Sequence, residues 1–419
     1  MQCLPVLMFL DLSIDQSIIK IMKTSKTFKF RLKLKPWMER KFSQWSGCCR
    51  FVYNKFLDQR VKTYNESKQP LSYVDQANEL PKLKKEFEWL KWPPSQSLQQ
   101  TLKDLDQGFK NFFRRVKNGT EKPGFPKFKR KGYSDSFRLP QIKKDAIWSD
   151  GKKGTVHLPK IGKIKFIKTR KIEGRIRNVT IINNAGKWYI CFNCEVDIIV
   201  PENNGSAIGV DRGVSHTIAT SEGKFFDIPK NSILYWEGRS IQAQKKLARQ
   251  EKGSNNRSKQ KARIRRINHK IFNIRKDFLH KVSTGIAKNH SCVVLEKLKT
   301  KNMTKSAKGS IESPGKNVKA KSGLNKAILM QGWYKFEQFL AYKVKWLGSC
   351  LKYVKPHYTS QRCSNLRCNH VSPKNRKTQE TFKCVKCGYA ENADVNAAKN
   401  IFTDGLLGRA CGDAALVGL

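Results

Sequence analysis

Acidic side chains are scarce in this sequence. Of its 419 residues only 33 are Asp or Glu, against 84 Lys or Arg, and the formal net charge is +51. A compact protein with so much self-repulsion needs a polyanionic partner, and nucleic acid bound through its phosphates is the usual one. A membrane-surface protein is disfavoured, because the basic residues are spread along the whole chain and are not confined to one amphipathic helix or tail.

Long hydrophobic runs are also missing. No stretch approaches the ~20 apolar residues that span a bilayer. The short apolar run at 3–10 lacks the basic flank and cleavage site of a signal peptide. We therefore predict no membrane partner and a cytoplasmic, nucleoid-associated protein, with the oligomeric state left open. Because Met22 stands just before a strongly basic segment, residues 1–21 are predicted to be an N-terminal extension.

Two catalytic motifs are absent. There is no Gly-x4-Gly-Lys-Ser/Thr phosphate loop, so the sequence implies no ATP-driven motor. There is no His–apolar–His pair, so the chemistry of tyrosine single-strand transposases is not supported. Hydrophobic residues make up 39% of the chain and aromatic residues 10%, which indicates a globular protein long enough for two or three domains.

Four of the twelve cysteines form two close pairs. Cys363 and Cys368 are separated by four residues, and Cys384 and Cys387, further along the chain, are separated by two. Two such pairs suit one tetrahedral Zn²⁺. Because four thiolates leave no open coordination position, the ion is predicted to be structural.

The remaining cysteines carry a weaker signal. Cys191 and Cys194 have a similar spacing, but strand alternation places their side chains on opposite faces of the predicted strand 188–196, so they are not expected to share a metal. The others are scattered. The overall pattern is more typical of an intracellular metal site than of a disulfide framework.

Three acids stand in apolar surroundings. Asp211 and Glu296 each end a short apolar strand, and Asp394 opens a helix, so the three can converge at one point of an α/β core. In so basic a chain, an acid with apolar neighbours is costly unless it holds a metal. Three carboxylates could hold two Mg²⁺ ions about 4 Å apart, which would generate the attacking hydroxide and stabilise the leaving oxygen of a phosphodiester. Taken singly, each acid could be a turn residue or a cap, and Asp394 in particular could be an N-cap.

The N-terminal half changes pattern twice. Residues 23–34 alternate apolar and basic side chains, as strands do. From 38 to 113 the pattern is helical, and Ser95 is a suitable N-cap for an amphipathic helix. Residues 137–200 predict short strands in a small β-barrel.

After a polar break at 201–206, strands and helices alternate. We predict a hairpin series over 207–228, a helical pair over 238–281, a helix over 333–347, strands at 293–295 and 351–358, and a mobile loop at 301–325.

Two segments concentrate positive charge. The loop 122–131 places aromatic rings among cations and could hold phosphates and stack on bases, although a solvated basic loop is the simpler alternative. The helical pair 238–281 holds fifteen Lys or Arg and two acids, which predicts a phosphate-binding face. The candidate contacts are Lys127, Lys129, Arg130, Arg257 and Arg263.

In combination these motifs resemble the TnpB family, the accessory OrfB proteins of insertion-sequence transposons, which are related to small type V CRISPR effectors. The resemblance runs from Met22 to the end of the chain. One departure lies in the first cysteine pair, where the family usually has two intervening residues and a Gly in place of Asn369. This departure predicts a looser first knuckle, where a knuckle is the turn that holds one cysteine pair. The resemblance rests on the runs around the three acids, the cysteine pairs and the segments Gly47–Asn54, Pro94–Gln100, Gly124–Lys129, Asn273–His280, Gln331–Trp333 and Tyr358–Gln361.

The resemblance implies an α+β multidomain fold. A wedge β-barrel (22–36 and 118–204) would be interrupted by a helical recognition domain (37–117). An RNase H-like, RuvC-type α/β domain (205–356 and 390–404) would follow, with an inserted four-cysteine zinc ribbon (357–389) and a tail (405–419).

The resemblance also implies a transposon-associated, RNA-guided DNA endonuclease. Its guide RNA would derive from the transposon end, and Asp211, Glu296 and Asp394 would bind two catalytic Mg²⁺ ions for cleavage of double-stranded DNA beside a short motif. One structural Zn²⁺ would sit in the ribbon. Contacts to that motif are predicted on the recognition helices, because a Gln amide can pair with adenine in the major groove; helix surface or packing is the alternative for these residues. The candidates are Tyr73 and Gln99, and Lys103 is predicted more generally to contact nucleic acid.

Two other functions stay open at this point. The chain could be a non-catalytic nucleic-acid-binding regulator of transposition. It could also be a transposase that joins strands itself, because fold alone does not separate hydrolysis from strand transfer.

Overall fold

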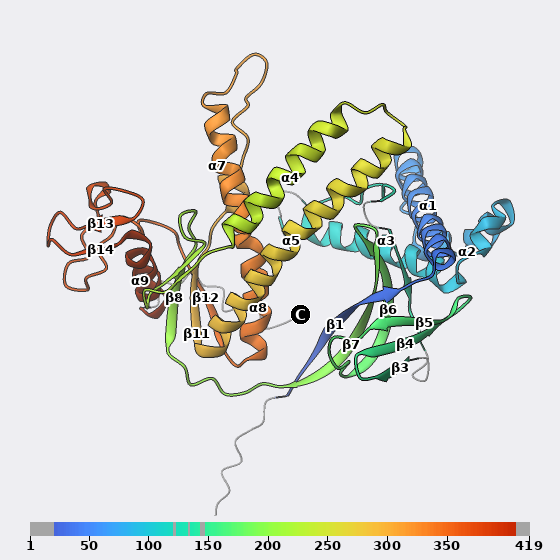
Figure 1. Cartoon of the computed structure of the whole chain (residues 1–419), viewed down its shortest axis with the longest axis horizontal. Helices are drawn as coiled ribbons and strands as arrows, with labels where there is room; N and C mark the ends of the chain where they lie inside the picture. The colour runs from blue at the N-terminus through green and yellow to red at the C-terminus, as the bar shows by residue number, and fades with distance from the viewer. Residues whose placement is uncertain (1–20, 120–122, 133–134, 143–146, 408–419) are drawn as a thin grey trace, which may run out of the picture. The chain divides into compact units, whose positions relative to one another are not determined.

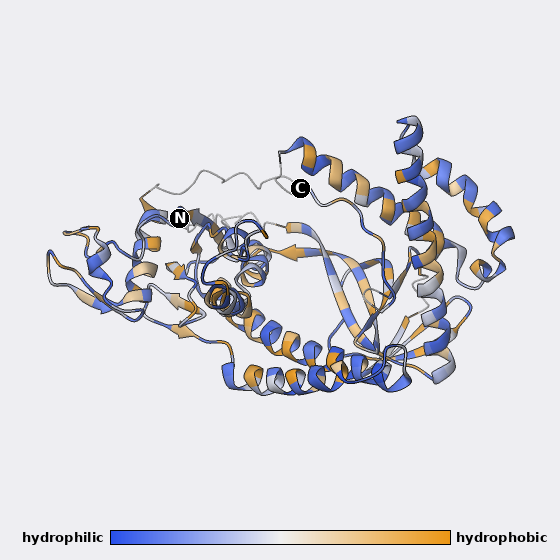
Figure 2. Cartoon of the chain, turned by 90° about the horizontal axis from the view of Figure 1, so that it is seen from above, coloured by the Kyte–Doolittle hydropathy of each residue, from blue (hydrophilic) through white to orange (hydrophobic). Residues whose placement is uncertain are grey.

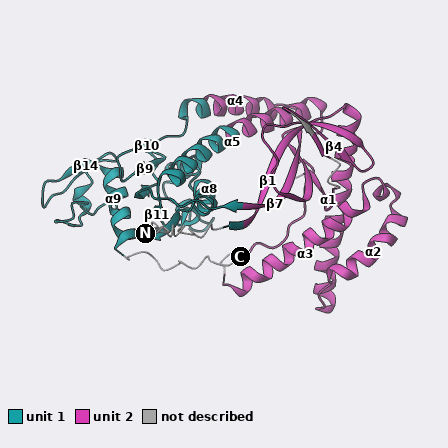
Figure 3. Cartoon of the chain, turned by 90° about the horizontal axis from the view of Figure 1, so that it is seen from below, with its two compact units in different colours: residues 1–22, 198–234, 272–419 teal, residues 23–197, 235–271 magenta. Residues whose placement is uncertain are grey.

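The computed structural model of the chain describes residues 21–119, 123–132, 135–142 and 147–407 (Figure 1). The predicted N-terminal extension, apart from its last residue, and residues 408–419 of the predicted tail lie outside this description. The described chain forms two compact units (Figure 3). One unit comprises Lys23–Asp197 and Tyr235–Ile271, and the other comprises Ile198–Leu234 and the chain from Phe272 onward.

The first unit is built on a seven-stranded sheet. Its strands alternate buried and more exposed residues. Hydrophobic and hydrophilic residues are accordingly mixed along them in Figure 2. The closed barrel stays a prediction, because β2 and β3 end the strand order. That order is β2 (Ser136–Leu139), β6 (Arg175–Asn184), β7 (Lys187–Ile199), β1 (Ile21–Lys33), β5 (Gly162–Ile167), β4 (Lys153–Leu158) and β3 (Ile147–Asp150).

Helices pack against this sheet to close its core. Phe42 and Trp45 of α1 contact Phe137 of β2 through their rings. Ser95 is not the N-cap of α3: that position is Pro94, and the Ser95 hydroxyl accepts a hydrogen bond from Lys84. The helices are α1 (Pro36–Ser67), α2 (Tyr73–Glu86), the 3-10 turn η1 (Glu88–Lys91) and α3 (Ser95–Lys117).

The second unit is built on a five-stranded mixed sheet. The predicted hairpin series is confirmed as three antiparallel strands, and β8 also pairs in parallel with β11, which pairs in parallel with β12. Cys292 and Cys350 lie opposite one another on β11 and β12 and form a disulfide, which the scattered cysteine pattern did not predict. The order is β10 (Phe225–Phe226), β9 (Ile218–Thr220), β8 (Ala207–Asp211), β11 (Cys292–Glu296) and β12 (Cys350–Val354).

Strand β11 is buried on both faces, because helices pack on each. Val293 and Leu295 pack with α5 (Asn255–Asn289) and α8 (Trp333–Trp346), whereas Val294 packs with α9 (Ala393–Leu406). Helix α4 (Lys230–Ala248) and α5 confirm the predicted helical pair. Among the described residues no helix combines the length and the apolar character needed to cross a membrane.

The predicted loop 301–325 is partly helical. Helix α6 (Thr300–Met303) is followed by α7 (Val318–Gln331), which begins inside the predicted loop. The prediction failed because composition does not reveal the bonds that order the segment: Lys321 and Asn325 donate to main-chain carbonyls at the end of α6 and just after it.

Candidate active site and metal centre

Asp211 is the last residue of β8, and close packing places it beside α9. A Cβ on Gly209 would lie 2.2 Å from the carbonyl oxygen of Ala398, so only glycine allows β8 to approach α9 this closely. On the next strand, Leu295 pairs with Val210, and Glu296 follows directly. Because carboxyl ends of parallel strands meet at one sheet edge, β8 and β11 bring Asp211 and Glu296 to the same place.

Asp394 reaches this edge from the first turn of α9. It is not the N-cap: Asn392 holds that position, and its side-chain oxygen accepts from the main-chain N–H groups of Asp394 and Val395. A Cβ on Gly213, two residues after Asp211, would lie 3.4 Å from Oδ2 of Asp394. The three acids predicted to converge therefore do line one pocket.

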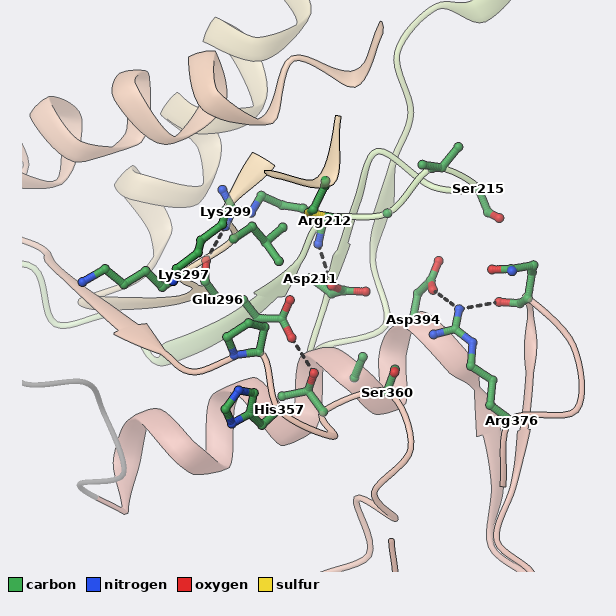
Figure 4. A pocket seen from close by; sticks show the side chains of 18 of the residues that line it. Asp211, Arg212, Ser215, Glu296, Lys297, Lys299, His357, Ser360, Arg376 and Asp394 are labelled. Carbon is green, nitrogen blue, oxygen red and sulfur yellow. Dashed lines mark hydrogen bonds and ion pairs between the residues drawn. The ribbon is translucent and has the colours of Figure 1, made fainter. Parts of the chain in front are cut away.

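This pocket has a volume of about 1080 Å³ and is drawn in Figure 4. Glu296 and Asp394 are buried at its wall, with 7% and 5% of their surface exposed. The Thr359 hydroxyl donates a hydrogen bond to Oε1 of Glu296. A guanidinium nitrogen of Arg376 lies 3.2 Å from Oδ1 of Asp394 and donates to the Gln379 carbonyl (Figure 4). Three lysines share the lining: Lys297, Lys299 and Lys355.

The surroundings of the three acids disfavour their ionisation. Burial, and then the charges of Glu296 and Asp394, raise the pKa of Asp211 to about 8. Burial also raises the pKa of Glu296, against the Thr359 hydrogen bond, and that of Asp394, against the Arg376 charge. Converging carboxylates that resist ionisation in this way would be relieved by a bound cation. Hard oxygen donors in a roomy pocket fit Mg²⁺.

The four predicted cysteines meet in space. Cys363 and Cys387 have their sulfur atoms 3.7 Å apart, as do Cys368 and Cys384, and all four sulfurs lie within 4.8 Å of one another. A tetrahedral ion with ~2.3 Å bonds to sulfur requires sulfur atoms about 3.8 Å apart. The set therefore fits Zn²⁺. Across the described chain it is the sole group of three or more His, Cys, Asp or Glu so tightly clustered, so the carboxylates of the pocket are more widely spaced.

The first knuckle is not loosened by its unusual residue. Asn369 adopts a left-handed backbone with φ of 47°, as Gly388 of the second knuckle does with φ of 74°. Asn tolerates this region better than most residues. The main-chain N–H of Asn369 donates to Asn365, and that of Gly388 to Cys384. Asn369 thus adopts the left-handed backbone conformation expected of a glycine at this position. Cys191, half-buried, and Cys194, fully buried, lie on opposite faces of β7, as predicted.

Three predicted DNA contacts lie on neighbouring helices. Tyr73 begins α2, and the Lys103 ammonium lies over its ring at 5.6 Å from the centroid. Gln99 lies one turn before Lys103 on α3, and both are exposed. The structure therefore brings an amide, a cation and an aromatic ring to one surface. Their contacts with DNA stay a prediction.

The basic loop divides its residues between surface and interior. Lys127 and Arg130 are exposed, with Phe128 between them. Lys129 turns inward, its ammonium 3.9 Å from the centroid of the Tyr53 ring, and burial lowers its pKa. Its main chain is bonded to the Asn54 side chain. Lys129 therefore has a packing role that its sequence context did not indicate.

Arg257, at the start of α5, is fixed by hydrogen bonds to the main chain near the end of α4. Arg257 donates to the carbonyls of Leu247 and Gln250 at the end of α4. Arg263 is exposed and lines a basic pocket of about 430 Å³ between the helices. Lysines and a further arginine complete its charged lining: Lys246, Lys259 and Arg266.

Sequence reasoning missed three residues around the acids: Arg212, Thr359 and Arg376. Arg212 and Thr359 both lie in runs that carried the family resemblance, although neither residue was singled out. Arg376 lies between the two cysteine pairs, and nothing in the sequence marked it as a neighbour of Asp394.

Comparisons with known proteins agree with this architecture. A family model described as "Probable transposase" matches residues 189–307, and one described as "Cas12f1-like, TNB domain" matches 333–401. A "Helix-turn-helix domain" model matches 22–69, where the structure forms β1 and the single helix α1. A solved structure of the mini-RNA-guided endonuclease CRISPR-Cas_phi3 has a TM-score of 0.50, 10% identity and coverage of 92% of this chain and 93% of its own. That likeness concerns the fold.

Two relatives align over most of the chain. "Putative RNA-guided DNA endonuclease InsQ" of Escherichia coli is 41% identical over 395 residues, which are 94% of this chain and 95% of the relative. A "Putative RNA-guided DNA endonuclease" of Streptomyces pristinaespiralis is 28% identical over 93% of this chain and 92% of its own. On this similarity and the matched models, the chain belongs to the TnpB (OrfB) family of transposon-encoded proteins.

Proposed function

We propose that this chain is a transposon-associated, RNA-guided DNA endonuclease whose RuvC-type site hydrolyses phosphodiesters. The observation that carries the proposal is the convergence of Asp211, Glu296 and Asp394 in one pocket of a chain with a net charge of +51. Its relatives' names point to the same activity. We assign the five-stranded unit to the RNase H-like domain, the segment 357–389 to a zinc ribbon, and the helices α1–α3 to target recognition.

The proposed chemistry follows from the lining of the pocket. The three acids would hold two Mg²⁺ ions, whose Lewis acidity activates water and stabilises the leaving oxygen. Thr359 fixes the Glu296 carboxylate through its hydrogen bond. Lys297, Lys299 and Lys355 supply positive charge for the phosphates of a DNA strand entering the pocket.

The proposed partners are a guide RNA from the transposon end and double-stranded target DNA at the nucleoid. The surface formed by Tyr73, Gln99 and Lys103 is our candidate for contacts to the target-adjacent motif. Guide pairing would supply the remaining specificity.

The proposal is tested by expressing the chain with its native flanking DNA and sequencing the RNA that co-purifies. The complex is then given a plasmid that matches the guide, with Mg²⁺. We expect linearised plasmid. No cleavage with any divalent metal would refute the proposal, and joined strands in place of breaks would favour a transposase.

We predict that Arg376→Ala lowers the cleavage rate by about 10–100-fold. Arg376 comes from the ribbon and ends beside Asp394, where it can meet a scissile phosphate once a metal neutralises the acid. The Mg²⁺ concentration that gives half the maximal rate should be unchanged or lower, because the Arg376 guanidinium no longer competes with Mg²⁺ for Asp394. Arg367→Ala, at an exposed ribbon arginine, is the control. An unchanged rate in Arg376→Ala would contradict the prediction.

We also predict that Arg263→Gln/Arg266→Gln weakens binding of the co-purified RNA and flattens its salt dependence. Both residues line the basic pocket between α4 and α5. Each lost phosphate contact should reduce the slope of log affinity against log salt by about 1. Lys245→Gln/Lys261→Gln removes two cations outside that pocket and serves as the control. Equal slopes in both variants would contradict a localised site.

A further inference from the structure

Arg212 is a buried charged side chain that lines the same pocket as the acids. Only 1% of its side-chain surface is exposed. One guanidinium nitrogen, Nη1, lies 2.8 Å from Oε2 of Glu337 on α8, and the other, Nη2, donates to the main-chain carbonyl of Glu296. Its own main-chain N–H donates to Oδ1 of Asp211 at 2.7 Å. Arg212 therefore touches both acid-bearing strands at once.

The sheet itself does not join these two strands at the level of the acids. Pairing between β8 and β11 ends at Val210 and Leu295, one residue before each acid. Beyond that pair, Asp211 is held from the opposite side by β9, and Glu296 by β12. The bond from Arg212 to the Glu296 carbonyl continues the connection across the gap where the sheet pairing stops.

Glu337 anchors the far end of this connection. It accepts from Arg212 and also hydrogen-bonds the Tyr353 hydroxyl on β12. Three neighbouring strands and α8 are thereby linked through the buried charge of Arg212 and the partly exposed charge of Glu337. Because Glu337 offsets the charge of Arg212, the pair adds little net positive charge to a site that must attract cations. Its contribution to the acids is therefore geometric.

We propose that buried Arg212 and its partner Glu337 form a brace that sets the separation of Asp211 and Glu296 and so determines how tightly the acid site binds divalent metal. Arg212 is a positioning residue, and the inference rests on the proposed metal-binding role of these acids. The planar fork of arginine is needed, because it reaches a carboxylate and a carbonyl in different directions, which one ammonium does not reproduce.

Replacing both partners separates positioning from simple stability. A buried ion pair exchanged for apolar residues of similar volume often costs little stability, whereas removing one partner leaves a buried charge. Arg212→Met/Glu337→Met should therefore fold with a Tm near that of the unaltered protein, yet lack the bond to the Glu296 carbonyl. A second buried pair, Arg362 and Asp404 at 2.8 Å, gives the matched control Arg362→Met/Asp404→Met.

The test is titration of the full-length chain with Mn²⁺ by calorimetry, with Asp211→Asn identifying the heat that belongs to the acid site. We expect the Kd for Mn²⁺ to rise about 10-fold in Arg212→Met/Glu337→Met and to be unchanged in the control pair. Arg212→Lys, which keeps the charge, should also bind Mn²⁺ more weakly and covers the case in which the double variant does not fold.

Each outcome has one meaning. Mn²⁺ affinity equal to that of the unaltered chain in either Arg212 variant would overturn the brace. Weaker binding in both, with the control pair unaffected, would establish it. If the unaltered chain showed no heat that Asp211→Asn removes, the proposed metal site itself would fail, and that result is distinct from failure of the brace.

Discussion

Asp211→Asn is expected to reduce DNA cleavage by at least about 10³-fold while leaving guide RNA binding intact. Asp211 stands between Glu296 and Asp394 at the edge of the sheet, and an amide has the same shape as the carboxylate but no charge for a metal ion. The basic pocket between α4 and α5 is built from other residues. Asp277→Asn, at an exposed acid of α5 that pairs with Lys281, is the control. Cleavage within tenfold of the unaltered protein would contradict the role of Asp211.

The same substitution should stabilise the metal-free protein at high pH. The folded state raises the pKa of Asp211 to about 8, so it holds the proton more tightly than the unfolded chain does. Stability is therefore lost as pH rises from about 4, the unfolded pKa, through 8. Asp211→Asn removes this loss. We expect its Tm at pH 8.5 without metal to exceed that of the unaltered protein by roughly 4–8 °C, for about 2 kcal/mol after discounting relaxation of the coupled acids.

The pH dependence gives an internal check on this interpretation. At pH 4 the two proteins should have similar Tm values, because Asp211 is then protonated in the folded state and about half protonated in the unfolded chain. Adding Mg²⁺ at pH 8.5 should raise the Tm of the unaltered protein and leave that of Asp211→Asn almost unchanged. A variant that is less stable at pH 8.5 than the unaltered protein would show that ionised Asp211 does not destabilise the metal-free fold.

The convergence of the three acids and the clustering of the four cysteines could be predicted because each of these residues stands in a local pattern with a physical meaning. An acid that ends an apolar strand, as Asp211 and Glu296 do, must lie at a sheet edge. Cysteines two or four residues apart can face one metal. Apolar residues at helical spacing predicted helices over residues 38–113, and the leucines of α3 are buried as expected.

What the sequence did not reveal depends on contacts between distant segments. The disulfide of Cys292 and Cys350 requires the register of two parallel strands 58 residues apart. Arg376 reaches Asp394 only once the ribbon has folded. The bonds from Arg257 to the carbonyls of Leu247 and Gln250 depend on the turn that follows α4, and its predicted phosphate contact stays a prediction. In each case the residue type allowed several roles, and the tertiary fold selected one.

Removing the second knuckle should show how strongly the ribbon and the active site depend on one another. We expect Cys384→Ser/Cys387→Ser to lose its zinc and at least about 10²-fold in cleavage rate, because structural zinc contributes on the order of 10–16 kcal/mol to the folding of small metal domains. A hairpin pairs β13 (Thr381–Lys383), inside the proposed ribbon, with β14 (Ala390–Asn392) just after it, and β14 runs directly into α9, which carries Asp394.

Two further connections link the four clustered cysteines to the acids. The Asn375 side chain is fully buried, donates to the Gln361 and His370 carbonyls and accepts from the Val385 N–H, so it ties the two knuckles together. Arg376 follows it and contacts Asp394. Unfolding of the Cys384/Cys387 knuckle should therefore displace Arg376 from Asp394 and also destabilise the start of α9.

The measurement is zinc content by mass spectrometry alongside cleavage and guide RNA binding. Cys191→Ser/Cys194→Ala, which alters the pair on opposite faces of β7, should keep one zinc per chain and its cleavage rate. RNA binding should survive in both variants, because the basic pocket between α4 and α5 does not involve the ribbon. A zinc-free protein that still cleaves at the normal rate would mean that Asp394 is positioned by α9 and β8 alone, through the close approach at Gly209, and that the ribbon serves another purpose.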